Sequence, residues 1–595
     1  MFGKILIANR GEIAIRVMRA CEELGIKTVA VYSELDRDAL HVQRADEAYL
    51  LGPAEAAKSY LNVDKIVEVV KESGADAVHP GYGFLSENAA FVERLEAEGI
   101  TFIGPPASAI DAMGSKTKAR ELMQKAGVPI VPGTTDAVET YEDALRIAKD
   151  EIGYPVAVKA ASGGGGKGFR VALTEDKLKD AYEGASREGE KFFSDGTVYL
   201  ERYLPKPRHV EVQIIADKHG NCIHLGERDC SIQRRHQKLI EEAPAPPWVV
   251  DEELRAKIGE IGINAAKAVN YVGAGTIEGM LQDGEYFFLE MNTRVQVEHC
   301  VTEAVTGIDI VKQGIKAAAG LELEYTQDDV QLRGHAIECR INAESAPMNF
   351  APTPGAIGGY LEPSGPGVRV DSGVGAGSVV SPQYDPMVAK LIVWDVDREQ
   401  ATQRMLRALS EYKIEGLTTL IPFHSTIIAT KNWAEASTCS ELLEDKEWLK
   451  STAPAEPVVP VDQDDEETVT RDYVVEVSGR KFDVKVHGAA FAPVAGAAGA
   501  AAAGPAPKKR SERKKSGGGG ADDLPSPIQG NMWKVVAKEG QEVAEGDLIC
   551  IIEAMKMENE IVAHKAGTIT TLAAKEGEPI NTGDLIATIK AAEAE

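Results

Sequence analysis

The chain has 595 residues, a formal net charge of -28 at pH 7 and the composition of a globular protein. Its length exceeds what one hydrophobic core supports, so we expect three to five domains. The acidic balance argues against a nucleic acid or an acidic membrane surface as partner of the whole chain.

Neither a signal peptide nor an apolar run long enough to cross a membrane is apparent, which predicts a cytoplasmic protein. The seven cysteines form no CxxC pair and no metal-ligand spacing; they stand at positions 21, 222, 230, 300, 339, 439 and 550. An odd, dispersed set of this kind indicates reduced core thiols rather than disulfides or a zinc site.

The first elements predict a βαβ unit: "KILIA" is a strand, "GEIAIRVMRACEELG" a helix and "TVAVYSE" a second strand. Ile13, Val17, Ala20 and Leu24 share one helix face, and Gly25 ends the helix. The loop "ANRGE" carries only one glycine, so the G-x-G-x-x-G fingerprint of a dinucleotide site is missing.

A glycine-rich segment, "YPVAVKAASGGGGKGFRVA", follows. It places Lys159 on a strand and Gly163 to Gly168 in a loop whose backbone N–H groups can approach phosphate oxygens. No G-K-[ST] follows, so this is not a Walker A loop; a glycine-rich lid between two strands resembles the ATP-grasp fold instead. The second "SGGGG", at 516–520, lies between polar and alanine-rich stretches and indicates a flexible linker.

The segments "GAGTIEGM" and "FFLEMNTRVQVEHCVTE" predict a hairpin in which Glu278 and Glu290 end two strands, with Asn292 beside them. Such oxygen ligands suit Mg²⁺ or Mn²⁺ bound to phosphates. Beyond Asn292, continued strand alternation would send Arg294, Gln296 and Glu298 to one face. A guanidinium, an amide and a carboxylate on one face could hold bicarbonate and remove its proton.

After residue 450 the chain changes character. "DYVVEVSGRKFDVKVHG" predicts a β-hairpin with too few strands to be stable alone, which we expect to pack on another domain or a partner subunit. Residues 489–525 are rich in alanine, glycine, proline and lysine and cannot supply a core. A tether of that length has an r.m.s. span of roughly 35 Å.

The C-terminal region contains a repeat. "KEG" and "GDLI" occur at 538–540 and 546–549 and return 37 residues later, which predicts a small all-β domain with two similar halves. Lys556, in "EAMKMEN", falls between the halves at an expected hairpin tip. A hairpin tip presents its amine to partners instead of burying it.

The "EAMKMEN" stretch, the glycine lid and "HPGYGFLSEN" at 79–88 together resemble biotin-dependent carboxylases. The resemblance implies a multidomain α/β and α+β protein: a Rossmann-like pre-ATP-grasp domain, an ATP-grasp domain, a biotin carboxylase C-terminal domain and an all-β biotinyl-lipoyl-like carrier domain. The first three domains are expected at 1–114, 115–332 and 333–450, in that order. A linker and β-hairpin at 451–488 and a flexible linker at 489–525 would precede the carrier domain at 526–592.

The resemblance also implies roles for individual residues. Lys556 would carry biotin, with lipoylation the weaker alternative because lipoyl domains lack the flanking methionines. ATP would be bound by Lys116, Lys159, Gly165, Gly166, Glu201, Leu204, His209, Gln233 and His236. Bicarbonate would be bound by Lys238, Arg294, Gln296 and Val297, and the metal by Glu278, Glu290 and Asn292. The catalytic set would be Lys238, Arg294, Glu298 as general base, and Arg340 stabilising the enolate of biotin.

Two positions depart from the family pattern. Cys300 replaces the proline of "EHPVTE", and Ser345 follows "RINAE" where aspartate is common. Neither change removes a proposed catalytic group, although Cys300 bears on the loop geometry beside Glu298.

The expected function is the biotin-containing subunit of an acyl-CoA carboxylase. Its expected partners are biotin protein ligase and a separate carboxyltransferase (beta) subunit, in a hetero-oligomer; acetyl-CoA and propionyl-CoA are the expected acceptors. A 3-methylcrotonyl-CoA or pyruvate carboxylase subunit would look the same in sequence. A different ATP-grasp ligase, with Lys556 unmodified, and a non-catalytic biotin carrier are the remaining alternatives.

Overall fold

The computed structural model describes residues 1–134, 136–160, 168–193, 195–235, 237–454, 468–477, 480–489, 522–527, 530–554, 557–580 and 583–590. The predicted glycine-rich lid at 163–167, most of the 489–525 linker and the Ser478-Gly479 turn lie outside these residues. Among the described helices, none combines the length and apolar character that crossing a bilayer requires.

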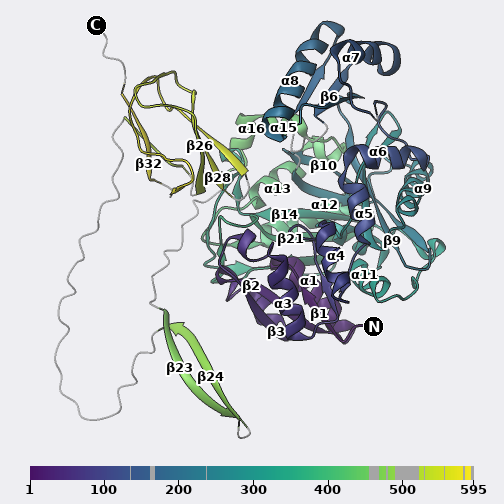
Figure 1. Cartoon of the computed structure of the whole chain (residues 1–595), viewed down its shortest axis with the longest axis vertical. Coiled ribbons are helices and arrows are strands. Elements are labelled where there is room, and N and C mark those ends of the chain that lie inside the picture. The colour runs from purple at the N-terminus through teal and green to yellow at the C-terminus, as the bar shows by residue number, and fades with distance from the viewer. Residues whose placement is uncertain are drawn as a thin grey trace, which may run out of the picture.

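The N-terminal part contains a parallel five-stranded sheet of order β3-β2-β1-β4-β5, which confirms the predicted βαβ unit and the Rossmann-like class (Figure 1). Successive residues of β1 face opposite layers: Ile5 and Ile7 pack with α1, and Leu6 packs with α3 and α4. The strands are β1 Lys4–Ile7, β2 Lys27–Ser33, β3 Glu47–Gly52, β4 Ala77–His79 and β5 Thr101–Phe102, and the helices are α1 Gly11–Glu23, α2 Leu40–Arg44, α3 Val63–Ser73, α4 Ala89–Ala97 and α5 Ala107–Gly114.

The central part of the molecule contains an antiparallel eight-stranded sheet of order β13-β12-β9-β10-β11-β14-β21-β19. Because β11 pairs with β14, the sheet runs without interruption across the division expected between residues 332 and 333. Its strands are β9 Arg208–Ala216, β10 Cys222–Arg234, β11 Gln237–Ala243, β12 Gly273–Gln282, β13 Glu285–Asn292, β14 His335–Asn342, β19 Val368–Ser372 and β21 Met387–Asp395.

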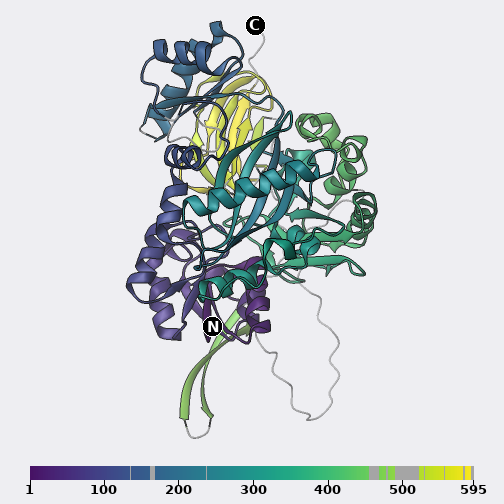
Figure 2. The same ribbon diagram turned by 90° about the vertical axis from the view of Figure 1, so that its right-hand side faces the viewer.

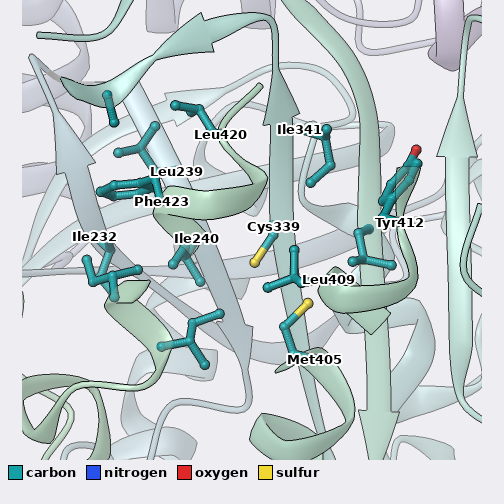
Figure 3. Packing of buried hydrophobic residues seen from close by; sticks show 14 of the residues in the cluster. Ile232, Leu239, Ile240, Cys339, Ile341, Met405, Leu409, Tyr412, Leu420 and Phe423 are labelled. Carbon is teal, nitrogen blue, oxygen red and sulfur yellow. The ribbon is translucent and has the colours of Figure 1, made fainter. Parts of the chain in front are cut away.

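Helices α9 and α12 cover one face of this sheet, whereas α10 and α11 cover only part of the other face and leave the rest to polar groups. Cys339 and Ile341 of β14 pack against Met405 and Leu409 of α12 (Figure 3), so alternation turns Arg340 to the opposite face. The surrounding helices are α6 Lys116–Lys125, α9 Glu252–Ala268, α10 His299–Thr306, α11 Ile310–Ala318, α12 Arg398–Glu411, α13 Ile421–Ile428, α14 Lys431–Ala434, α15 Ser440–Glu444 and α16 Lys446–Lys450.

Short elements complete this region. The helical turns are η1 Glu34–Asp36, η2 Ala56–Lys58, η3 Ala148–Ile152, η4 Gln327–Asp329 and η5 Ala346–Met348. Three two-stranded pairs, β15 with β16, β17 with β20 and β18 with β22, comprise Glu344–Ser345, Ala351–Pro352, Gly355–Ala356, Val379–Val380, Tyr360–Leu361 and Lys413–Ile414.

A small lobe projects beside the eight-stranded sheet, at the top of Figure 1. It has its own core, in which α7 (Tyr141–Ile147) and α8 (Glu175–Phe193) cover a sheet of order β7-β6-β8. The strands are β6 Val156–Ala160, β7 Phe169–Ala172 and β8 Val198–Arg202. Strands β6 and β7 flank the glycine-rich segment, as the sequence predicts.

The C-terminal domain confirms the predicted repeat. Strands β26, β27 and β28 begin at residues 530, 542 and 548, and β30, β31 and β32 begin 37 residues later in each case. The two four-stranded sheets, β29-β28-β26-β31 and β25-β32-β30-β27, each take two strands from either half. The strands are β25 Asp523–Pro525, β26 Gly530–Val535, β27 Glu542–Val543, β28 Leu548–Ala554, β29 Met557–Val562, β30 Gly567–Leu572, β31 Pro579–Ile580 and β32 Leu585–Lys590.

The predicted β-hairpin before the linker is also present. β23 (Thr468–Val477) pairs antiparallel with β24 (Arg480–Ala489) along the whole length of both strands. What covers this hairpin stays a prediction.

Candidate active site

A large cavity lies between the lobe of residues 156–202 and the polar face of the eight-stranded sheet. Its volume, about 810 Å³, is enough for a nucleotide and a second small ligand. The sequence-predicted residues that line it are Lys159, Glu201, His209, Gln233, Lys238, Glu278, Glu290, Asn292, Arg294, Gln296, Val297, Glu298 and Arg340. Side chains from strands of both sheets and from one loop therefore converge on one space.

The remaining predicted residues are not brought into this cavity by the described structure. Leu204 is 8% exposed and packs with Val131 and Phe287. Lys116 begins α6, but its side chain lies outside the described part of the chain. The same holds for the whole of Gly165, Gly166, His236 and Lys556.

Lys159 on β6 lines one end of the cavity. Its ammonium group lies 5.8 Å from the ring centroid of Phe169 and 6.0 Å from that of Tyr199. Lys159 and Arg120 both form ion pairs with Glu201 on β8. Two cations on one carboxylate leave a net positive charge at this wall, which suits a phosphate group.

The predicted carboxylate hairpin is present. Glu278 and Glu290 lie directly opposite each other in the β12–β13 ladder, and both face the cavity with Asn292. The expectation that Glu278 ends its strand is wrong, because β12 continues to Gln282. Oxygen donors at one wall of a polar cavity fit Mg²⁺, so these three residues are the ones that would hold it.

Glu278 is also held by several neighbouring donors. Its Oε1 accepts hydrogen bonds from Lys238 Nζ at 2.8 Å and Gln296 Nε2 at 2.5 Å, and its Oε2 lies 3.0 Å from His209 Nε2. Burial raises the pKa of Glu278, but the Lys238 ammonium and His209 outweigh burial and hold that pKa well below its usual range. The carboxylate is therefore ionised and ready to bind a cation.

The loop after β13 corrects one sequence expectation. Strand alternation was expected to continue past Asn292, but β13 ends there and α10 begins at His299. Glu87 accepts hydrogen bonds from the Thr293 backbone N–H at 3.0 Å and from Arg294 Nε at 3.1 Å, which turns the chain out of the sheet. The turn still leaves Arg294, Gln296 and Glu298 in the cavity wall.

Glu298 forms ion pairs with two cations, Lys238 and Arg340. Its Oε1 accepts from Lys238 Nζ at 2.6 Å and its Oε2 from Arg340 Nη2 at 2.9 Å. Burial raises the pKa of Glu298, but the Lys238 and Arg340 cations outweigh burial and the repulsion from Glu211, so the pKa is lowered. Glu298 is thus a buried but ionised carboxylate, which is the form that a base requires.

A second carboxylate fixes Arg340. Arg340 Nε donates to Oε1 of Glu241 at 2.6 Å, and burial raises the pKa of Glu241 to about 7 despite this contact. Glu338, directly opposite Glu241 in the ladder, is fully buried, and burial raises its pKa well above the ordinary value. Arg340 therefore lies among three glutamates, of which Glu298 is the one that lines the cavity.

The sequence reasoning missed the ion pair beneath the site. Arg228, fully buried on β10, donates to Glu211 Oε1 at 2.6 Å and to Gln296 Oε1 at 2.7 Å, and Glu211 also pairs with Lys238. Burial of a charge is costly unless it is paired, so this pair orders the floor of the site. The available clue was charge within two predicted strands: Glu211 in "HVEVQII" and the run Glu227-Arg228-Asp229 in "CIHLGERDC".

Cys300 occupies the first turn of α10. Its Sγ lies 3.3 Å from Oδ2 of Asp371 and 3.2 Å from Nζ of the fully buried Lys390, which donates to the Val297 carbonyl at 2.8 Å. Burial raises the pKa of Cys300 well above its ordinary value, so the thiol is neutral. Ser345 lies in β15 and pairs with Ala351.

Four family models match the chain in order. They are "Biotin carboxylase, N-terminal domain" at 1–110, "Carbamoyl-phosphate synthase L chain, ATP binding domain" at 115–326, "Biotin carboxylase C-terminal domain" at 338–445 and "Biotin-requiring enzyme" at 523–589. Together they span the cavity and the repeated β domain.

Individual proteins are similar to different extents. A pyruvate carboxylase subunit of Methanothermobacter thermautotrophicus is 56% identical over 428 residues, 72% of this chain and 87% of that protein. The biotin-dependent acyl-coenzyme A carboxylase alpha3 subunit of Mycobacterium leprae is 46% identical over 590 residues, 96% of this chain and 95% of that protein.

Solved structures agree with these relatives. The biotin carboxylase domain of the Hydrogenobacter thermophilus 2-oxoglutarate carboxylase, in complex with MgADP, ADP and bicarbonate, superposes with a TM-score of 0.70 at 48% identity. The match covers 77% of this chain and 100% of that one.

Proposed function

This chain belongs to the biotin-dependent carboxylases, as a biotin carboxylase fused to a biotinyl carrier domain, and from that premise we propose that it is the biotin-containing subunit of an acyl-CoA carboxylase. It is an ATP-dependent ligase whose cofactors are biotin, ATP and Mg²⁺. The proposed acceptors are acetyl-CoA and propionyl-CoA. A separate carboxyltransferase subunit would act on them in a hetero-oligomer, and biotin protein ligase would attach biotin to Lys556.

The observation that carries the acyl-CoA proposal is the extent of one match. The Mycobacterium leprae acyl-CoA carboxylase protein aligns from the first domain through the carrier domain, with the linker in between. The Methanothermobacter pyruvate carboxylase protein has the higher identity, 56%, over the carboxylase part. A pyruvate carboxylase subunit is therefore the second candidate; a 3-methylcrotonyl-CoA carboxylase subunit would have the same domain order.

The first step is phosphoryl transfer from ATP to bicarbonate. Lys159, at the nucleotide end of the cavity, would neutralise phosphate charge together with Lys116 and the glycine-rich lid. Glu278, Glu290 and Asn292 would hold Mg²⁺, which would supply further neutralisation of the phosphates.

Bicarbonate is bound at the other end of the cavity. Arg294, Gln296 and Val297 line the cavity wall, and Lys238 supplies an ammonium group to the same cavity. These donors would orient the anion so that one oxygen attacks the γ-phosphorus. Glu298, ionised and within 2.6 Å of Lys238, would accept the bicarbonate proton.

The resulting carboxyphosphate would break down to CO₂ and phosphate. The N–C bond to CO₂ would replace the N–H bond of the biotin ureido group, and the released phosphate would take up that proton. Arg340, held by Glu241 and Glu298, would bind the ureido oxygen. Because a cavity enclosed by protein restricts water, CO₂ is kept near the acceptor.

The test is to capture the biotinylated protein, with its bound subunits, from its native lysate on monomeric avidin. MgATP, labelled bicarbonate and a panel of acetyl-, propionyl- and 3-methylcrotonyl-CoA and pyruvate are then supplied. Acid-stable label on acetyl- or propionyl-CoA is the expected result. Label on pyruvate or 3-methylcrotonyl-CoA alone would replace the acceptor proposal, and failure to bind avidin would overturn the assignment of Lys556.

A further inference from the structure

The carrier domain contacts the carboxylase part of the chain beside the loop of residues 344–352. Ala351, half-buried in β16, packs against the hydrophobic core of the carrier domain. In Figure 1 the carrier strands lie beside α15 and α16, and in Figure 2 the yellow carrier strands appear between the blue α7–α8 lobe and the green helices. The carboxylase part of the chain therefore provides a surface that contacts the carrier domain.

The turn between β10 and β11 lies against the same loop. Arg234 donates a hydrogen bond to Asn349, and its guanidinium lies 4.6 Å from the ring centroid of Phe350. Gln233 and Gln237, on either side of this turn, line the active-site cavity. The turn and the loop therefore form part of the cavity rim.

Two groups on this rim are suited to a protein partner. Arg235 is exposed, and within the described part of the chain neither it nor Arg234 forms an ion pair with a carboxylate. Met348 is 56% exposed and lies in the same loop as Ala351, which contacts the carrier. An unpaired cation beside an exposed thioether offers both charge and apolar contact.

The backbone of the rim is held in a strained conformation. Arg235 has φ +50°, and Asn349 and Phe350 both have φ +61°, in the left-handed region that residues other than glycine rarely adopt. Such strain persists only where surrounding contacts enforce it, and it concentrates at binding and catalytic sites. Here the Arg234 contacts with Asn349 and Phe350 supply that enforcement.

The carrier hairpin has the complementary charge. Between Leu548 and Val562 the sequence contains Glu553, Glu558 and Glu560, and Lys556 is the only basic residue. Ala554 pairs with Met557, and residues 555 and 556 between them lie outside the described residues. Because amide formation with biotin removes the Lys556 charge, the biotinylated hairpin is more acidic than the unmodified one.

We propose that Arg235, Met348 and Ala351 form a docking surface, the carrier-docking rim, that receives the acidic hairpin of this chain's own carrier domain while its biotin enters the cavity. This inference rests on the proposed function. Arg235 steers the hairpin by charge, and Met348 and Ala351 provide the apolar contact. The rim therefore affects delivery of the protein-bound biotin to the cavity and does not affect the reaction within the cavity.

The experiment uses the biotinylated full chain and compares two reactions in the same preparation. One is single-turnover transfer of label from bicarbonate to the protein-bound biotin; the other is bicarbonate-dependent ADP formation stimulated by free biotin. Arg235→Glu and Met348→Glu are each expected to slow the first reaction about three- to tenfold and to leave the second unchanged. Arg37→Glu, an exposed arginine whose guanidinium lies over the ring of Tyr32, is the matched control and should change neither.

Two results would overturn the docking rim. One is an unchanged rate of transfer to the protein-bound biotin in both variants; the other is an equal loss of both reactions, which would place the residues in the cavity's chemistry. Failure of the proposed function itself is distinguishable, because the unsubstituted chain would then form no ADP in response to bicarbonate and free biotin.

Discussion

Lys238 Nζ lies 2.6 Å from Oε1 of Glu298, and the same ammonium group also pairs with Glu211 and Glu278. Burial lowers the pKa of this lysine, but the three carboxylates outweigh burial and hold that pKa well above its usual range. In return the lysine keeps Glu298 ionised. The protonation state of the base in the proposed reaction is therefore set by a residue on another element.

Replacing Lys238 with Met should shift the pH dependence of catalysis. Without the ammonium group, burial and the Glu211 charge raise the pKa of Glu298 against the remaining Arg340 and Arg228 cations, so less of the carboxylate is ionised. We expect bicarbonate-dependent ADP formation at pH 7 to fall about 10²-fold or more, with partial recovery at higher pH. Initial rates between pH 6 and 9.5 check this, with Lys218→Met as the control; an acid limb that does not move would contradict it.

Replacing Cys300 with Pro should be tolerated. Cys300 is in the first turn of α10, where a backbone N–H has no acceptor within the helix, so proline removes no helical hydrogen bond there. We expect ADP formation within about threefold of the unsubstituted chain. The matched control is Ala304→Pro, further along the same helix, which should cost about 3 kcal/mol of folding free energy. Steady-state rates and thermal unfolding distinguish the two; similar losses in both variants would show that the Sγ contacts near Lys390 are required.

Glu344 should make stability depend on pH. It is 1% exposed, and burial raises its pKa to about 7, above the ordinary value of 4.5 that applies to the unfolded chain. The folded state therefore binds more protons between these values, and the free energy of unfolding falls as pH rises from about 4.5 through 7. A shift of this size corresponds to roughly 3 kcal/mol.

Glu344→Gln should remove that pH dependence. We expect a higher midpoint of thermal unfolding than the unsubstituted chain at pH 8 and little difference at pH 5. Glu447→Gln, whose side chain is 81% exposed, is the control and should leave the profile unchanged. A Glu344→Gln profile parallel to that of the unsubstituted chain would be inconsistent with a buried, proton-binding Glu344.

Lys556→Arg should separate the two halves of the function. A guanidinium does not form the amide that carries biotin, so capture on avidin and label transfer to any acyl-CoA should both be lost. ADP formation stimulated by free biotin should remain, because every cavity residue is intact. Lys538→Arg, in the same domain, is the control. Retained avidin binding would place the biotin on a different lysine.

The sequence predicted the parts of the fold that depend on local pattern. The helix of Ile13 and Val17, the Glu278–Glu290 hairpin and the repeat around Lys556 each follow from periodicity within a short segment. The class of each domain followed from motifs in the same way. Residue roles carried over from the family remain predictions.

The parts that were missed depend on contacts between distant segments. Glu87 accepts hydrogen bonds from the Thr293 N–H and from Arg294, which is 207 residues away in the sequence. These contacts end β13 at a point where alternation alone predicted a longer strand. Arg228 and Glu211 likewise become a pair only once β9 and β10 are aligned in register. A polar residue in an apolar strand indicates a partner, but the sequence does not say which.

Because the two halves of the carrier domain exchange strands, the domain can fold only after both halves have been synthesised. The sheet that holds the Lys556 hairpin ends in β31, and the facing sheet contains β32, so the domain is incomplete until the chain beyond residue 585 has been synthesised. An enzyme that recognises the folded hairpin therefore meets its substrate only after translation has passed β32. Deleting Leu585–Lys590 should leave the "EAMKMEN" letters intact and still stop the attachment of biotin, because the nascent hairpin has no finished domain to hold it.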